Sequence, residues 1–119
     1  MGWKHYKDLI VWQKSMDLVE EVYALTKRLP VDERYALTDQ IRRAVVSVPS
    51  NVAEGHGRQT DKEFRQFLSI AKGSVCEVET QLLICVRLKY LTEEQITRAI
   101  TLCDEIRKML TKLILSFSF

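Results

Sequence analysis

Apolar residues recur at intervals of three and four along nearly the whole chain, and no segment alternates with period two for the length of a strand. This spacing is typical of amphipathic helices with one face in a core. The pattern is interrupted near Pro30, around His56 and at Tyr90, which divides the chain into four helices joined by short connections. We therefore predict one all-α domain over residues 1–119, an antiparallel up-down-up-down four-helix bundle.

The first predicted helix spans residues 8–29 and ends at Pro30. The residues on its expected wide core face are Leu9, Trp12, Met16, Val19, Tyr23 and Thr26, with Leu18, Val22, Leu25 and Leu29 beside them. Asp32 can cap the second helix, which places the Glu33 carboxylate in its first turn, where the helix dipole favours a negative charge.

Pro49 falls inside the second helix, where a proline costs about 3 kcal/mol in a regular helix interior. The apolar spacing nevertheless continues through it. We predict that this helix is kinked at Pro49 and continues to about Glu54. Ser47 or Ser50 can bond the backbone groups that the proline frees, and Gly55 is the expected C-terminal stop.

Capping boxes that begin at Thr60 and Thr92 mark the starts of the third and fourth helices. The third is expected to run to about Lys89 and the fourth to Ile114. Gly73, inside the third helix, costs about 1 kcal/mol relative to alanine. We therefore expect it at a close helix crossing.

With 46% apolar and 29% charged residues in 119, the composition is that of an ordinary globular chain. Cys76 and Cys85 point to opposite sides of one helix, so they cannot form a disulfide with each other or share a metal. We expect these two and Cys103 to be small core residues in a reducing compartment. No apolar run approaches the roughly 20 residues of a membrane span, and the N-terminus lacks a signal-peptide core. A cytoplasmic location and no membrane association are the expectation.

Candidates for catalysis and metal binding are few. His5 and His56 are the only histidines, and the chain contains no HExxH motif and no metal-spaced Cys/His set. The Gly-His-Gly-Arg stretch has neither the spacing of a dinucleotide-binding loop nor the Lys-Ser/Thr ending of a P-loop. We expect no catalytic residues, no cofactor and no metal site, and we read this stretch as a connector.

Five polar residues lie next to the predicted core positions: Gln40, Ser47, Glu54, Ser74 and Glu77. Ser74 and Glu77 are three apart and share a helix face. We expect a buried hydrogen-bonded network, or a subunit contact, that sets the register of the helices. A catalytic carboxylate pair and a contact to nucleic acid or a partner are the alternatives.

The basic residues are concentrated in one part of the chain. The net charge between Gln40 and Val75 is +3, above the +2 of the whole chain. Arginine can hold two phosphate oxygens, so a nucleic-acid surface is one interpretation, and an ordinary solvated face is the other. The candidate residues are Arg42, Arg43, Arg58, Lys62, Arg65 and Lys72.

Four segments resemble the bacterial four helix bundle proteins associated with intervening sequences of large-subunit ribosomal RNA genes. They read VWQKSMDLVEEVY, LTDQIRRAVVSVPSNVAEGHGR, EFRQFLSIAKGSVCEVETQL and ITLCDEIRKML, and the similarity covers nearly the whole chain. This resemblance implies a small cytoplasmic all-α protein that assembles as a homopentamer, without enzymatic activity. The family is also similar to the accessory protein of diversity-generating retroelements, a basic pentameric barrel that binds nucleic acid and a reverse transcriptase.

Two functions remain open on this basis. The first is a non-enzymatic oligomeric bundle that binds RNA or a ribonucleoprotein through the basic surface of the second and third helices. The second is a protein–protein scaffold ring, suggested by apolar residues in excess of what a slim bundle buries. These residues are Trp3, Trp12, Leu115, Phe117 and Phe119.

Overall fold

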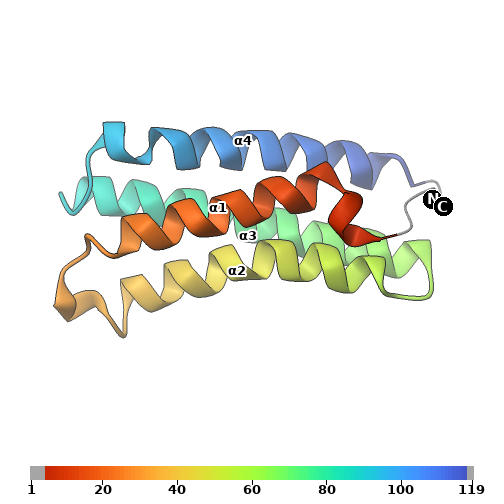
Figure 1. The fold of residues 1–119 in the computed structure, drawn as a ribbon, viewed down its shortest axis with the longest axis horizontal. Helices are drawn as coiled ribbons and strands as arrows, with labels where there is room; N and C mark the ends of the chain where they lie inside the picture. Colours follow the sequence, from red (N-terminus) through yellow and green to blue (C-terminus); the bar gives the residue numbers. More distant parts are fainter. Residues whose placement is uncertain (1–4, 118–119) are drawn as a thin grey trace.

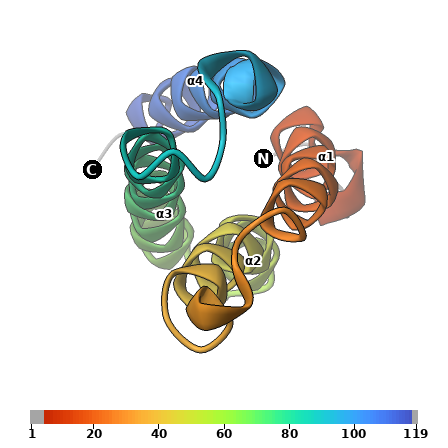
Figure 2. The same cartoon turned by 90° about the vertical axis from the view of Figure 1, so that its left-hand side faces the viewer.

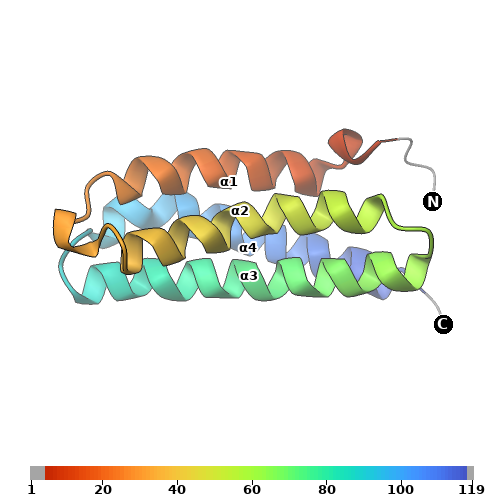
Figure 3. The ribbon, with the colours of Figure 1, turned by 90° about the horizontal axis from the view of Figure 1, so that it is seen from below.

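The computed structural model describes residues 5–117 and consists of four long helices packed side by side (Figures 1 and 3). The long helices are α1 (Ile10–Thr26), α2 (Leu37–His56), α3 (Asp61–Arg87) and α4 (Glu93–Leu115). Two short 3-10 helices, η1 (Tyr6–Asp8) and η2 (Val31–Glu33), precede α1 and α2. The described residues contain no strand, which confirms the all-α class.

The four helices stand at the corners of a square when the bundle is viewed from one end (Figure 2). Each helix contacts its two neighbours, so that α1 and α3 both lie beside α2 and α4. The 27 residues of α3 span about 40 Å, nearly the full 44 Å length of the molecule. Consecutive helices run in opposite directions, which confirms the predicted antiparallel four-helix bundle.

The core is a continuous column of aliphatic side chains along the bundle axis. Its largest fully buried members are Leu18, Ile41, Leu68, Leu82, Ile106 and Leu110. Cys85 and Cys103 are buried in it, as predicted, whereas Cys76 is exposed, so the core role predicted for that thiol is wrong. Burial raises the pKa of Cys103 to about 12.

The face of α1 that meets the core agrees with the predicted stripe at Leu18, Val22 and Leu25 and differs from it at Met16. The buried row runs through Val11, Ser15, Leu18 and Val22, while Met16 is 41% exposed. Ser15 made this row look polar in the sequence. Its hydroxyl donates to the carbonyl of Val11, 2.6 Å away, so the helix itself satisfies the buried polar group.

The second helix begins five residues later than Asp32, so the predicted cap at that residue is wrong. Asp32 and Glu33 form η2 instead, and α2 starts at Leu37. Glu33 still interacts with the helix start, because its Oε1 accepts a hydrogen bond from Leu37 N at 3.4 Å. Its other oxygen, Oε2, accepts from the Tyr90 hydroxyl at 2.8 Å, which links η2 to the connection between α3 and α4.

Helix α2 is continuous through Pro49, as predicted, and extends to His56. The proline leaves the Val45 carbonyl without its usual intrahelical donor. The hydroxyls of Ser47 and Ser50 donate to the carbonyls on either side, those of Ala44 and Val46. The two hydroxyls therefore do not donate to the Val45 carbonyl, which Pro49 leaves free.

Neither helical glycine has the role expected for it. Gly55 is not the stop of α2 but a buried residue inside it, where a Cβ would lie 2.6 Å from Phe67 Cβ. Gly73, expected at a close crossing, has nothing within 4 Å of its Cβ position. The close approach of α2 and α3 is therefore made at Gly55, near their connected ends.

Helix α3 ends at Arg87, two residues before the predicted Lys89, in a Schellman arrangement. Lys89 adopts a positive φ of 66°, and Tyr90 N donates back to the Cys85 carbonyl at 2.9 Å. Thr60 and Thr92 cap α3 and α4 as predicted, since each side chain accepts a hydrogen bond from the backbone three residues on; the reciprocal bond of a full capping box is present at Thr92, where Gln95 accepts from the Thr92 backbone.

The C-terminal apolar segment packs partly on the chain's own bundle. Phe117 is 8% exposed, and its ring lies 5.6 Å from that of Phe64. Leu115 is 73% exposed, and Trp12 is half-buried. Trp3 and Phe119 lie outside the described residues.

Candidate nucleic-acid interface

The basic residues predicted on the second helix lie on different sides of it. Arg42 points toward α1, where its Nε donates to Thr26 Oγ1 at 2.9 Å and its guanidinium lies 4.7 Å from the centre of the Tyr23 ring. Arg43 is exposed and pairs with Asp39 one turn earlier, at 3.0 Å. Arg42 therefore serves the contact between α1 and α2, whereas Arg43 is available to solvent.

The basic residues around the connection between α2 and α3 form a second group. Arg58 pairs with Glu54 at 2.8 Å and lies over the Phe67 ring, 4.8 Å from its centre. Lys62 is exposed in the first turn of α3, and Arg65 is half-buried one turn later. These residues lie at the opposite end of α2 from Arg42 and Arg43, about 20 Å away along the helix.

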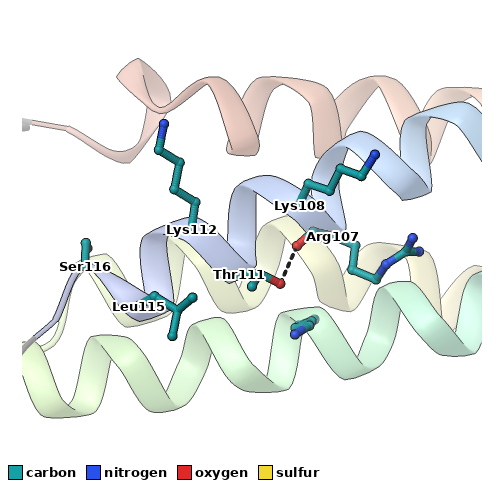
Figure 4. A pocket seen from close by; sticks show the side chains of 7 residues that line it. Arg107, Lys108, Thr111, Lys112, Leu115 and Ser116 are labelled. Atoms are coloured by element: carbon teal, nitrogen blue, oxygen red, sulfur yellow. Dashed lines mark hydrogen bonds between the residues drawn. The ribbon is translucent and has the colours of Figure 1, made fainter.

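Lys72, the last of the six candidates, belongs to a hollow of about 520 Å³ between α3 and α4 (Figure 4). We call this hollow the basic groove. Its lining residues are Lys72 of α3 and Arg107, Lys108, Thr111, Lys112, Leu115 and Ser116, of which the last is the C-cap of α4. Four of these seven residues are cations, and three of the four come from α4.

The α4 side chains in the basic groove leave the helix in two directions. Figure 4 shows Arg107, Thr111 and Leu115 on the side that faces α3. Lys108 and Lys112 extend from the other side of the helix. The cations therefore form a band that passes from α3 across the last turns of α4.

Two carboxylates balance part of this charge. Arg107 pairs with Glu79 of α3 at 3.1 Å and with Asp104 at 2.5 Å. Lys108 pairs with the other oxygen of Asp104 at 3.0 Å, and this hydrogen bond holds the pKa of Asp104 below its ordinary value. Within residues 5–117, the structure gives Lys72 and Lys112 no ion-pair partner.

The three α4 cations are absent from the sequence-based candidates, because charge was counted along the chain and the count ended at Val75. A signal for them exists in the sequence. Arg107, Lys108 and Lys112 follow helical spacing, and the antiparallel topology places the end of α4 beside the first half of α3. Counting charge across adjacent helices would have joined them to Lys72.

The predicted polar residues gather on the outer side of the contact between α2 and α3, with one exception. The Ser47 and Ser74 hydroxyls are hydrogen-bonded 2.5 Å apart, and Gln40, Ser47 and Glu77 line a shared hollow. Glu54 lies about 10 Å further along α2 and pairs with Arg58 instead.

None of these five side chains is buried within a single chain, so the expected buried network is absent there, and the subunit contact stays a prediction. Gln81, which the sequence analysis did not select, is the buried polar residue at this contact, only 5% exposed. Its Nε2 donates to Glu77 Oε2 at 3.5 Å, and its Oε1 has no protein partner.

Neither metal chemistry nor membrane insertion gains support in the part of the chain that the structure describes. Across residues 5–117, no three His, Cys, Asp or Glu side chains come together as a metal site would require. No helix in the same range combines the length and the apolar character needed to cross a bilayer.

Comparison with known proteins agrees with the four-helix arrangement. Residues 7–112 match the family described as 23S rRNA-intervening sequence protein. A crystal structure of a protein with unknown function from the S23 ribosomal protein family of Bacteroides thetaiotaomicron superimposes with a TM-score of 0.80. The two sequences are 30% identical over 88% of this chain and 98% of that one. Curated protein sequences contain no significant match. On this evidence the chain belongs to the 23S rRNA-intervening sequence protein family.

Proposed function

We propose that this protein is a non-enzymatic, oligomeric four-helix bundle that binds RNA or a ribonucleoprotein through the basic surface of α3 and α4. The observation that carries the proposal is the basic groove. Cations from two consecutive, antiparallel helices line one hollow, and Lys72 and Lys112 have no ion-pair partner in the described range. Unpaired cations beside a groove suit a phosphate backbone, which is uniformly charged.

The lining of the basic groove favours contact with phosphates over contact with bases. Its residues include no aromatic side chain on which a base could stack. The side chains that remain are cations, two hydroxyl groups and Leu115. We therefore expect binding with little sequence preference and with a strong dependence on salt.

The family description supports RNA as the polyanion. It links the family to intervening sequences of 23S rRNA, and the related crystal structure comes from a protein assigned to a ribosomal protein family. An RNA partner in the cytoplasm is consistent with the mildly basic charge of +2. A nucleic-acid enzyme that acts on the same RNA is a second partner that this surface suits.

The test is fluorescence anisotropy of a labelled 20-nucleotide single-stranded RNA at several salt concentrations. Reversing both unpaired cations, Lys72→Glu with Lys112→Glu, is expected to weaken binding about tenfold or more and to flatten the salt dependence. The matched control is Lys27→Glu with Arg28→Glu, the same change of charge at two exposed positions after α1. Equal losses in the two variants would show non-specific attraction and contradict the assignment to the groove.

The oligomeric part of the proposal is supported by apolar side chains on α3 that one chain leaves exposed. Ile70, Ile84 and Leu88 are between 40% and 50% exposed, and Ile70 and Ile84 lie fourteen residues apart on one face of the helix. Exposed apolar side chains on one face are typical of a protein interface. The homopentamer implied by the family resemblance is the assembly that we expect.

Light scattering coupled to size-exclusion chromatography measures the mass of the assembly. We expect Ile84→Glu to shift the protein to smaller species without loss of helix content. A wild-type protein that assembles but binds no RNA at low salt would favour the second candidate function, a protein–protein scaffold ring.

A further inference from the structure

We propose that the basic groove is a phosphate-chain site in which Asp104 is a built-in competitor. In the free protein the Asp104 carboxylate occupies Arg107 and Lys108, and a bound phosphate chain takes its place on these two cations. This inference rests on the proposed function, since it concerns the same groove. It adds a residue that sets the affinity of the groove for anions.

The geometry of Asp104 is that of an anion shared between two cations. Its Oδ1 accepts a hydrogen bond from Arg107 Nη2 at 2.5 Å, and its Oδ2 lies 3.0 Å from Lys108 Nζ. Both oxygens of the carboxylate are thus occupied, and both cations line the groove. A phosphate group offers the same pair of oxygens to the same two donors.

The exchange of one anion for another is feasible because these groups are accessible. The side chain of Asp104 is 41% exposed, and that of Lys108 is 76% exposed. Ion pairs at such exposure are weak, because water solvates both partners when the pair separates. Asp104 can therefore turn toward solvent when another anion arrives.

A phosphate chain has an advantage over Asp104 that a single phosphate lacks. Lys112 lies one turn beyond Lys108 on α4, about 6 Å further along the axis, and Lys72 lies on the opposite helix. A chain of phosphates can contact these two unpaired cations and displace Asp104 at the same time. The contacts of the phosphate chain with Lys72 and Lys112, which Asp104 does not make, then favour the displacement of Asp104.

Glu79 is not part of the competition. It pairs with Arg107 from α3 at 3.1 Å, and its side chain is only 28% exposed. This pair joins the two helices beneath the groove and holds Arg107 in place. The roles of the two carboxylates therefore differ, although both contact Arg107.

The experiment replaces Asp104 by asparagine, which keeps the size and a hydrogen-bond acceptor but removes the charge. Binding of the labelled single-stranded RNA is expected to tighten by about two- to tenfold. The salt dependence is expected to steepen by about 0.7 to 1.4 in log–log slope, because up to two further cations contact phosphate. A cooperative thermal unfolding transition serves as the check that the variant is folded.

The matched control is Glu105→Gln, which removes one charge from the neighbouring position of α4. Glu105 pairs with Lys14 of α1 and does not line the basic groove. If only the general gain in positive charge mattered, RNA would bind both variants more tightly by the same factor, and this result would overturn the proposal. The proposal requires the increase in RNA affinity to be larger in Asp104→Asn than in Glu105→Gln.

Inorganic tripolyphosphate, titrated by calorimetry, separates the two proposals. If RNA binding is unaffected by reversal of Lys72 and Lys112, the proposed function fails at this groove. The competition still requires tripolyphosphate to bind Asp104→Asn more tightly than Glu105→Gln. Equal tripolyphosphate affinities in these two variants would overturn the role of Asp104, even where RNA binding to the groove is confirmed.

Discussion

Gly55 of α2 lies against Phe67 of α3 so closely that the space holds no side chain. A Cβ at position 55 would be 2.6 Å from Phe67 Cβ and 3.3 Å from the Phe64 carbonyl oxygen. Contacts this short require the backbones of two helices to separate. The contact therefore sets the spacing of α2 and α3 near the turn that joins them.

Gly55→Ala is expected to lower the free energy of unfolding by about 1 to 3 kcal/mol, because the added methyl group overpacks the contact. Urea denaturation measures the change. Gly73→Ala is the matched control, since nothing lies within 4 Å of that Cβ position in a single chain. It is expected to stabilise the helix by up to about 1 kcal/mol. Stabilisation of both variants would show that the Gly55 contact is looser than described.

Lys89 is the described non-glycine residue with a positive φ, 66°, and it closes the C-terminus of α3. A side chain in this conformation costs about 1 kcal/mol relative to glycine. Lys89→Gly is therefore expected to stabilise the protein by up to this amount, measured by thermal unfolding. Lys89→Ala separates charge from conformation, because it removes the ammonium group but keeps the strain. A gain in Lys89→Ala as large as that in Lys89→Gly would contradict the conformational explanation.

The three thiols are expected to differ in reactivity. Cys76 is exposed, whereas Cys85 and Cys103 are buried. One thiol should react with Ellman's reagent in the native protein at pH 8, and all three after denaturation. Rapid reaction of a second thiol in the native state would show that the core is open at that position.

Burial of the Cys85 and Cys103 thiols predicts a loss of stability at alkaline pH. It raises the pKa of Cys85 to about 11 and that of Cys103 to about 12, from an ordinary value of 9.0. The unfolded chain therefore loses these protons before the folded chain does. The neutral thiols stabilise the fold fully below pH 9, and this contribution falls as the pH rises toward 11 and 12. Cys103→Ala is expected to reduce this slope.

Much of the fold could be predicted because its signals are local. The capping boxes at Thr60 and Thr92 involve residues three apart, and the helical period is visible within a few turns. Local signals also misled in places. Asp32 has a capping side chain, yet the chain enters a 3-10 turn there and begins α2 at Leu37.

The candidate site was less predictable, because its members come from separate helices. The sequence identified Lys72 and placed it with Arg58, Lys62 and Arg65 along the start of the third helix. The structure places Lys72 with Arg107 and Lys112 instead, because the residues that line the hollow beside Lys72 come from α4. The sequence paired Ser74 with Glu77, whereas in the structure the Ser74 hydroxyl is hydrogen-bonded to that of Ser47, and both serines lie at the edge of the core.

The sequence by itself determined the number of helices, their approximate bounds, their antiparallel order and the family. The helices and their order depend on hydrophobic period, capping residues and short connections, which act over a few residues, whereas the family is indicated by the resemblance of four sequence segments. Only the tertiary structure decided which side chains meet: Gly55 with Phe67, Glu33 with Tyr90, and Asp104 and Lys72 around the basic groove. The rotation of each helix about its own axis determines these contacts, and the packing of all four helices sets that rotation.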